Sequence, residues 1–188
     1  MTAAQIVVVG SYNRDVSFSV ARLPTPGETC LSLGRLDSPG GKGSNQAIQA
    51  ARCGAATAMI AAVGTDAAGD AALALWVADG IATQHVVRLT GHPTGMATIL
   101  VDATAENMIV VDSGANAHLA PAHIEAASDL ISAARVVVAR STSPNTRVPP
   151  RANKVTSRDI ARIISAPSNA ALTASSMPWS LEASRSRR

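Results

Sequence analysis

The chain has 188 residues, 47% of them apolar but only 2% aromatic, and its formal net charge is +3. This composition predicts one domain of ordinary size with an aliphatic core. The chain contains no run of about 18 apolar residues and no basic stretch ahead of an apolar one, so we expect a cytoplasmic protein without a membrane span or signal peptide. We expect Cys30 and Cys53 to be free thiols, because they lack the spacing of metal ligands.

Short apolar runs alternate with helical segments along the first 139 residues. The runs suited to strands buried on both faces are Ile6–Val9, Met59–Val63 and Val136–Val138. The predicted helices span Asn45–Arg52, Ala67–Asp79 and Ala122–Ser132, the last introduced by Pro121. This alternation predicts an α/β fold with parallel strands. Trp76 lies in the second helix, where we expect it in the core.

Two further regions have the pattern of β-hairpins, with turn residues between apolar runs. The first pairs Val16–Val20 with Cys30–Leu36, and the second pairs Gly95–Val101 with Asn107–Val111.

The run from Ser38 to Ala47, SPGGKGSNQA, is the most informative stretch of the chain. Its glycines let the backbone approach a ligand, and the helix expected from Asn45 offers unpaired N–H groups. It is not a Walker A loop, because Lys42 is followed by Gly43 rather than Ser or Thr. Lys42 would face the ligand or be a solvated surface charge, and Asn45 would contact the ligand or cap the helix.

The order of motifs around this run is specific. An apolar strand leads into Asn13-Arg14-Asp15, then Pro24-Thr25-Pro26-Gly27-Glu28-Thr29, and then the glycine-rich run. Later matches are Gly64-Thr65-Asp66 with Gly69, Pro93-Thr94-Gly95 and Gly114-Ala115-Asn116. Over roughly residues 5 to 139, the chain resembles the amino-terminal half of ribokinase-like members of the PfkB carbohydrate kinase family.

The resemblance implies a ribokinase-like parallel-sheet sandwich with a small β lid, formed by residues of about 16–37 and 93–112. In this family the lid covers the sugar and often pairs two subunits. The activity implied is ATP-dependent phosphorylation of a pentose, D-ribose to ribose 5-phosphate, with Mg²⁺ and K⁺. The residues implied to bind the sugar are Asn13, Asp15, Gly41, Lys42, Gly43 and Asn45.

The side chains at two of these positions suit a sugar. Asp15 follows the first strand, where open α/β sheets bind ligands, and its carboxylate can accept hydrogen bonds from two hydroxyls. Asn13 offers a donor and an acceptor. Without the resemblance, a turn-forming role would be the simpler interpretation of Asp15.

The family's catalytic signature, Asp-Thr-x-Gly-Ala-Gly-Asp, is missing from the sequence. Its last aspartate is the base that takes the proton of the sugar hydroxyl. Ala68-Gly69-Asp70 resembles its end but falls in the first half of the chain, so we interpret Asp70 as structural. We therefore predict a chain truncated before the nucleotide-binding half, without a catalytic residue and with the ATP, Mg²⁺ and K⁺ sites largely missing. The alternative function is that of an inactive sugar-binding fragment.

The charge of the chain changes near residue 140. Residues 1–139 carry seven Lys or Arg and eleven Asp or Glu, whereas residues 140–188 carry nine and two. We predict that this basic, Ser- and Pro-rich tail is disordered, and favour a frameshifted reading frame over an evolved extension. A tail that binds nucleic acid is a third possibility. Against it, Trp179 is the one aromatic residue among the basic residues of the tail, and the tail contains no recognised nucleic-acid-binding motif. The histidines, His85, His92, His118 and His123, fall in unrelated segments without metal-ligand grouping.

Overall fold

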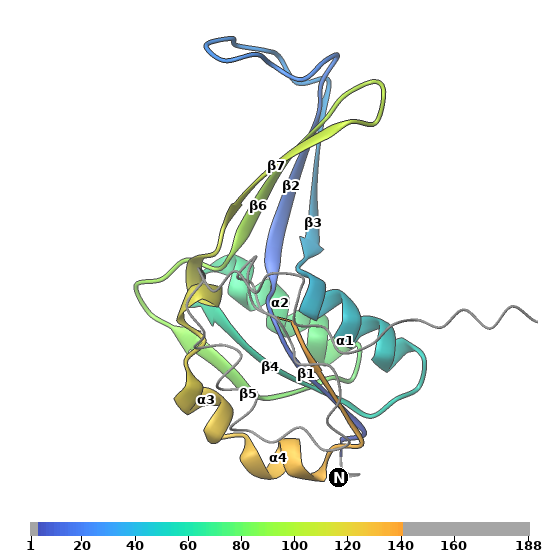
Figure 1. The fold of residues 1–188 in the computed structure, drawn as a ribbon, viewed down its shortest axis with the longest axis vertical. Helices are drawn as coiled ribbons and strands as arrows, with labels where there is room; N and C mark the ends of the chain where they lie inside the picture. The colour runs from blue at the N-terminus through green and yellow to red at the C-terminus, as the bar shows by residue number, and fades with distance from the viewer. Residues whose placement is uncertain (1–3, 141–188) are drawn as a thin grey trace, which may run out of the picture.

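The structure is a computed structural model that describes residues 4–140. They form two sheets of four strands each, with the strand orders β5-β4-β1-β8 and β3-β2-β6-β7. Figure 1 shows the first sheet within an α/β body and the second extending away from it. The tail predicted to be disordered lies outside the described residues, apart from Arg140.

The first sheet is entirely parallel, as the sequence predicts. It consists of β1 (Ile6–Val9), β4 (Thr57–Gly64), β5 (Ala82–Leu89) and β8 (Val136–Ala139). The three predicted strands are confirmed, and β4 begins two residues earlier than predicted. Every residue of β4 is buried, which explains why it consists almost wholly of small and apolar side chains.

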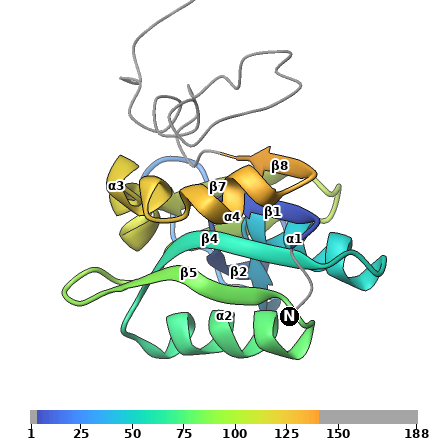
Figure 2. The same cartoon turned by 90° about the horizontal axis from the view of Figure 1, so that it is seen from below.

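Helices cover both faces of this sheet, as Figure 2 shows. On one face, α1 (Lys42–Arg52) and α2 (Ala67–Ala78) pack their Ala47, Ala72 and Trp76 against β1 and β4. On the other face, α3 (Pro121–Glu125) and α4 (Ser128–Ala133) contribute Ile124 and Ile131. Because successive strand residues point to opposite faces, Val8 joins the first cluster, whereas Val7 and Val9 join the second.

The prediction of one helix over Ala122–Ser132 is wrong, because the chain forms two short helices there. At the break, the Ala127 N–H donates to the carbonyl of Ile124, three residues earlier, at 3.1 Å. This tighter turn interrupts the α-helical pattern. Pro121 does begin the first helix, as predicted.

The second sheet is the predicted lid. It consists of β2 (Asn13–Ser19), β3 (Gly34–Gly40), β6 (Met96–Val101) and β7 (Asn107–Asp112). The two hairpins are antiparallel, and β2 joins them by pairing with β6 in parallel. The second hairpin is confirmed. In the first, the predicted range Cys30–Leu36 is wrong in its bounds, because β3 spans Gly34–Gly40 and residues 30–33 belong to the exposed loop at the lid's tip.

A short 3₁₀ helix, η1 (Gly114–His118), follows the lid and returns the chain to the body. Within residues 4–140, no helix is long and apolar enough to cross a membrane.

Candidate functional site

The predicted site residues meet where the lid joins the body. β1 continues through Gly10 to Tyr12 into β2, and β3 continues through Gly41 into α1. The pairing of β2 with β3 places Asn13 opposite Gly40 and Asp15 opposite Ser38. The glycine-rich run therefore lies beside Asn13 and Asp15, at the carboxyl end of β1, where open α/β sheets bind ligands.

The helix at this junction begins earlier than the sequence predicts. Gly41 is its N-cap, with φ 90° and ψ 123°, and Lys42 is its first residue. The Asn45 N–H donates to the Gly41 carbonyl at 2.9 Å, so the interpretation of Asn45 as a cap is wrong. The side chains of Lys42 and Asn45 are exposed on the first turn of the helix. They are therefore accessible to a ligand beside the lid.

Gly43 has a packing role. A Cβ at this position would lie 2.7 Å from the Cα of Gly10 and 2.8 Å from the backbone nitrogen of Ser11. The next residue, Ser44, donates its N–H to the Ser11 carbonyl at 3.0 Å. The start of α1 is therefore pressed against the chain leaving β1, and only glycine fits at residue 43.

Ser44 also ties α1 to α2. The indole Nε1 of Trp76 donates to the Ser44 hydroxyl at 2.9 Å, and both residues are fully buried. Trp76 contacts Tyr12 edge to face, with ring centroids 5.7 Å apart. The prediction that Trp76 is a core residue is confirmed, and its N–H has the partner that a buried indole requires.

Asn116 organises the junction from the opposite side. Its side chain accepts the Tyr12 N–H at 3.2 Å and donates to the Tyr12 carbonyl at 2.8 Å. It also donates to the Asn13 Oδ1 at 3.0 Å, so the Asn13 NH₂ group remains available to a ligand. The sequence identified Gly114-Ala115-Asn116 as a motif but gave no sign that Asn116 orients Asn13.

Asp15 is half-buried in the lid, and its carboxylate accepts no hydrogen bond from any described residue. Burial raises the pKa of this carboxyl above its ordinary value. Any side chain at Gly40, on the paired strand, would collide with the carboxylate. The lack of a side chain at Gly40 therefore lets the Asp15 carboxylate pack over that residue while its oxygens stay accessible.

Asp66 and Asp70 have structural roles. Asp66 caps α2 by accepting the Gly69 N–H at 2.9 Å, and it also accepts the N–H and hydroxyl of Thr94 at 2.8 and 2.5 Å. Desolvation opposes its ionisation, but these hydrogen bonds outweigh it and lower the pKa of Asp66. Asp70 is exposed and pairs with Arg88 at 2.5 Å, in agreement with its interpretation as structural.

The structure brings together two histidines that the sequence separates. The rings of His92 and His118 have centroids 3.8 Å apart. Residues 4–140 contain no group of three or more His, Cys, Asp or Glu side chains that could hold a metal ion. None of the described residues is therefore assigned to the Mg²⁺ or K⁺ expected for the family.

Comparison with known proteins agrees with this geometry. The chain is 42% identical to the ribokinase of Haemophilus influenzae over 114 residues, which are 61% of this chain and 37% of that protein. It is 37% identical to the ribokinase of Mus musculus, covering 72% of this chain and 42% of the relative. The chain thus spans about two fifths of the length of these relatives.

A solved structure of Arabidopsis thaliana ribokinase, complexed with ribose and ATP, matches the fold with a TM-score of 0.61 and 29% identity. The match covers 73% of this chain and 45% of that structure. It confirms the predicted ribokinase-like fold, with its parallel sheet and lid.

The sequence model of the pfkB family carbohydrate kinases matches residues 3–175. The motifs placed the end of the resemblance near residue 139. The family match continues to residue 175, so the end predicted from the motifs is too early. Because the match covers most of its length, the chain belongs to the pfkB family of carbohydrate kinases.

Proposed function

We propose that this chain is the pentose-binding part of a ribokinase-type enzyme, whose whole reaction is transfer of a phosphoryl group from ATP to the 5-hydroxyl of D-ribose. The observation that carries the proposal is the half-buried Asp15 carboxylate, unpaired among the described residues and placed beside Asn13 and the glycine-rich run. Relatives named ribokinase and deoxyribokinase support a pentose as the ligand.

In this proposal Asp15 accepts hydrogen bonds from two sugar hydroxyls, each contributing about 1.5–3 kcal/mol. Asn13 donates its NH₂ group to a third, because Asn116 occupies its oxygen. Lys42 and Asn45 contact the sugar from the exposed first turn of α1, and Gly41 keeps the backbone close. Gly43 contributes indirectly, by letting α1 approach the strand that leads to Asn13.

We further propose that the chain alone does not transfer phosphate. The sequence lacks the Gly-Ala-Gly-Asp segment that supplies the family's base and its anion hole. A general base contributes roughly 10²–10⁴-fold to a rate. The hydrogen-bond donors of an anion hole, which stabilise the negative charge of the transition state, contribute about another 10²–10³-fold. Their combined absence would make turnover undetectable, whereas sugar binding needs neither.

Isothermal titration with D-ribose tests the binding proposal. We expect Asp15→Asn to weaken ribose binding by about 10–100-fold, from the energy of the lost charge-assisted bonds. Asp70→Asn is the matched control, because this exposed aspartate pairs only with Arg88, and its affinity should equal that of the wild type. Equal ribose affinity in Asp15→Asn and the wild type would remove Asp15 from the site.

Two further measurements define the ligand and the reaction. Titration with 2-deoxyribose shows whether the 2-hydroxyl is recognised. Incubation with ribose, ATP and Mg²⁺ should yield no ribose 5-phosphate, and steady formation of that product would show that the chain carries its own base.

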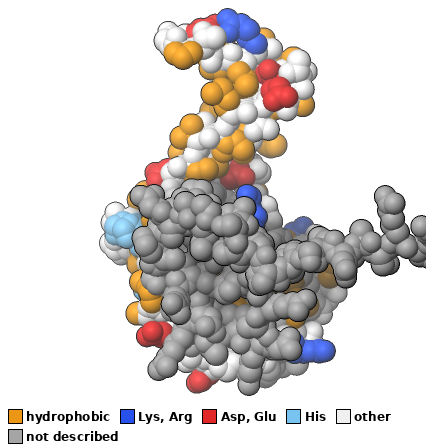
Figure 3. Space-filling model, in the orientation of Figure 1, with side chains coloured by type: hydrophobic (Ala, Val, Ile, Leu, Met, Phe, Trp, Pro, Cys, Tyr) orange, Lys and Arg blue, Asp and Glu red, His pale blue; other side chains and the backbone are white. Residues whose placement is uncertain are grey.

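The lid also supports a proposal about assembly. Its edge strand β7 is exposed along its whole length, with Met108, Ile109, Val110 and Val111 each more than half exposed. Figure 3 shows apolar side chains along the lid beyond the body. We propose that two lids pair in a homodimer, because an exposed apolar sheet of this kind favours association. Light scattering should give a dimer mass for the wild type and a monomer mass for Val110→Asp.

A further inference from the structure

A cleft lies between the lid and α2. Its volume is about 460 Å³. It is lined by residues of the β1–β2 junction, of β2 and β3 and of α2: Tyr12, Arg14, Asp37, Ser38, Pro39, Ala67, Ala68, Ala71 and Leu75. Arg14 lies between Asn13 and Asp15 in β2, and alternate strand residues point to opposite faces. The cleft and the proposed sugar site therefore use opposite faces of the same strand.

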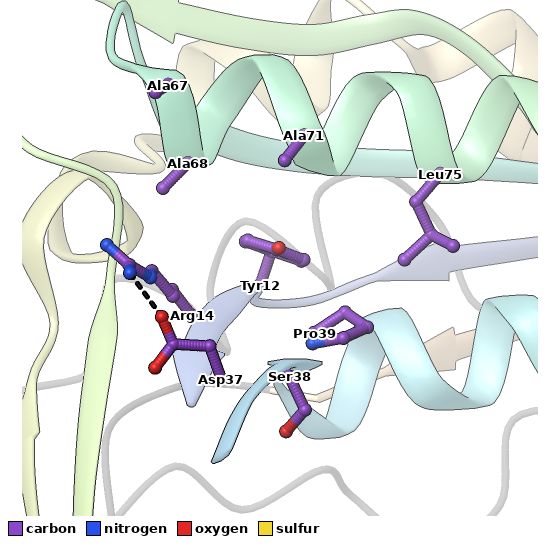
Figure 4. A pocket seen from close by; sticks show the side chains of 9 residues that line it. All are labelled: Tyr12, Arg14, Asp37, Ser38, Pro39, Ala67, Ala68, Ala71 and Leu75. Atoms are coloured by element: carbon purple, nitrogen blue, oxygen red, sulfur yellow. Dashed lines mark hydrogen bonds and ion pairs between the residues drawn. The ribbon is translucent and has the colours of Figure 1, made fainter. Parts of the chain in front are cut away.

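The cleft has a polar end and an apolar end. Figure 4 shows Arg14 and Asp37 at one end, Leu75 at the other, and Tyr12 between α2 and Pro39. The alanines of α2 face the same space and keep it open, since none of them extends beyond a methyl group. Such a cleft suits a ligand with an apolar body and one polar group.

Arg14 and Asp37 form the polar end of the cleft. Arg14 donates through one nitrogen to Asp37 at 2.5 Å, and Arg35 donates through two to the same carboxylate at 2.8 Å. Two guanidinium groups thus share one carboxylate. The remaining N–H groups of Arg14 donate to no described residue, and its side chain is 46% exposed. They are positioned to bind an oxyanion.

Tyr12 offers a second polar group to a ligand in the cleft. The residue is only 3% exposed, but residues 4–140 contain no buried side-chain oxygen without a hydrogen-bond partner, so its unpaired hydroxyl is the accessible part of the side chain. Figure 4 shows this hydroxyl facing the space between the cleft's side chains. The hydroxyl is therefore open to a polar atom of a ligand in the cleft.

We propose that this cleft binds a small organic oxyanion with an apolar body. Arg14 binds the oxyanion, the Tyr12 hydroxyl bonds to a second polar atom of the ligand, and Ala71, Leu75 and Pro39 contact the apolar body. The proposal is independent of the sugar site, because it uses none of the residues assigned to ribose.

Two dyes of the same shape and different charge test this proposal on the full chain. Anilinonaphthalene sulfonate is an apolar oxyanion that fluoresces when bound, and phenylnaphthylamine is its neutral counterpart. We expect saturable binding of the sulfonate dye, weakened about tenfold by Arg14→Gln through loss of one charge-assisted bond. The same substitution should leave binding of the neutral dye nearly unchanged. Tyr12→Phe should also weaken binding of the sulfonate dye.

Two variants locate the bound dye. Ala71→Trp fills the cleft from an exposed helix position and should abolish binding of both dyes. Val110→Asp changes the exposed lid face and should leave binding at the cleft unchanged. Absence of saturable binding, insensitivity to Arg14→Gln and Ala71→Trp, or loss of binding in Val110→Asp would each overturn the proposal.

Discussion

Substitution of Gly43 by alanine tests whether the junction of lid and body depends on close backbone contact. The added Cβ would lie 2.7 and 2.8 Å from backbone atoms of Gly10 and Ser11, which cannot rotate away as a side chain can. Relief therefore requires α1 to move from the strand. Overpacking of this kind costs about 1–3 kcal/mol.

An opposing effect must be subtracted. Gly43 lies within α1, and alanine is favoured over glycine in a helix interior by about 1 kcal/mol. The difference leaves an expected net loss of up to about 2 kcal/mol in the free energy of unfolding. For a chain of this size the corresponding fall in melting temperature is about 2–4 °C per kcal/mol.

Urea unfolding followed by circular dichroism measures this loss, with two glycine controls. Gly34→Ala meets nothing within 4 Å and needs no positive φ, so we expect a change within about 0.5 kcal/mol. Gly54→Ala also meets nothing within 4 Å but has a φ of +88°, so it measures backbone strain alone. If Gly43→Ala proves as stable as Gly34→Ala, close packing of α1 on the strand is not what requires glycine there.

Two other predictions concern the supports of the junction. Ser44→Ala leaves the buried indole N–H of Trp76 without its acceptor and should cost about 1–3 kcal/mol in urea unfolding; an unchanged midpoint would mean that this bond contributes nothing net. Asp66 should make stability depend on acid pH. Because its pKa is lowered in the folded state, its contribution is complete above the unfolded value of 3.8 and is lost as pH falls through the lower folded pKa. Asp66→Asn should therefore be less stable than the wild type at neutral pH, and the difference should shrink in that acid range; a constant difference would contradict the linkage.

Strand prediction succeeded where an apolar run is uninterrupted and failed where polar residues break the run. Ile6–Val9 and Val136–Val138 are uninterrupted apolar runs, and both are strands. β5 was missed because Gln84, His85 and Arg88 interrupt its apolar pattern, whereas β8, at the other edge of the sheet, has no such interruption. The Cys30–Leu36 error has the opposite cause, since apolar residues of an exposed loop imitate a strand.

Within the site, motif order located Asn13 and Asp15, but the local pattern misjudged the start of α1. Lys42, Gly43 and Ser44 are a weak helix-forming sequence, so a helix from Asn45 was the natural prediction. The structure begins the helix at Lys42 because Ser44 is held by Ser11 and Trp76, from distant parts of the chain. Such tertiary contacts override propensity and leave no trace in the local sequence.

The same junction gives a last prediction, which depends on both proposed sites: sugar and oxyanion should affect each other's affinity. Asn116 bonds to both backbone groups of Tyr12 and to the side chain of Asn13, so it links a residue of the cleft to a residue of the sugar site. A ligand that moves Tyr12 therefore acts on Asn13 through the hydrogen bonds that Asn116 makes to both residues.

Couplings of this kind are commonly about 5–150-fold, and linkage requires the same factor in both directions. We expect ribose to change the dissociation constant of anilinonaphthalene sulfonate by the factor by which the dye changes that of ribose. Asn116→Ala should reduce the coupling towards unity while leaving the cleft's own lining residues intact. If both ligands bind and neither alters the other's affinity, the Asn116 network holds the two faces of β2 too rigidly to transmit a change.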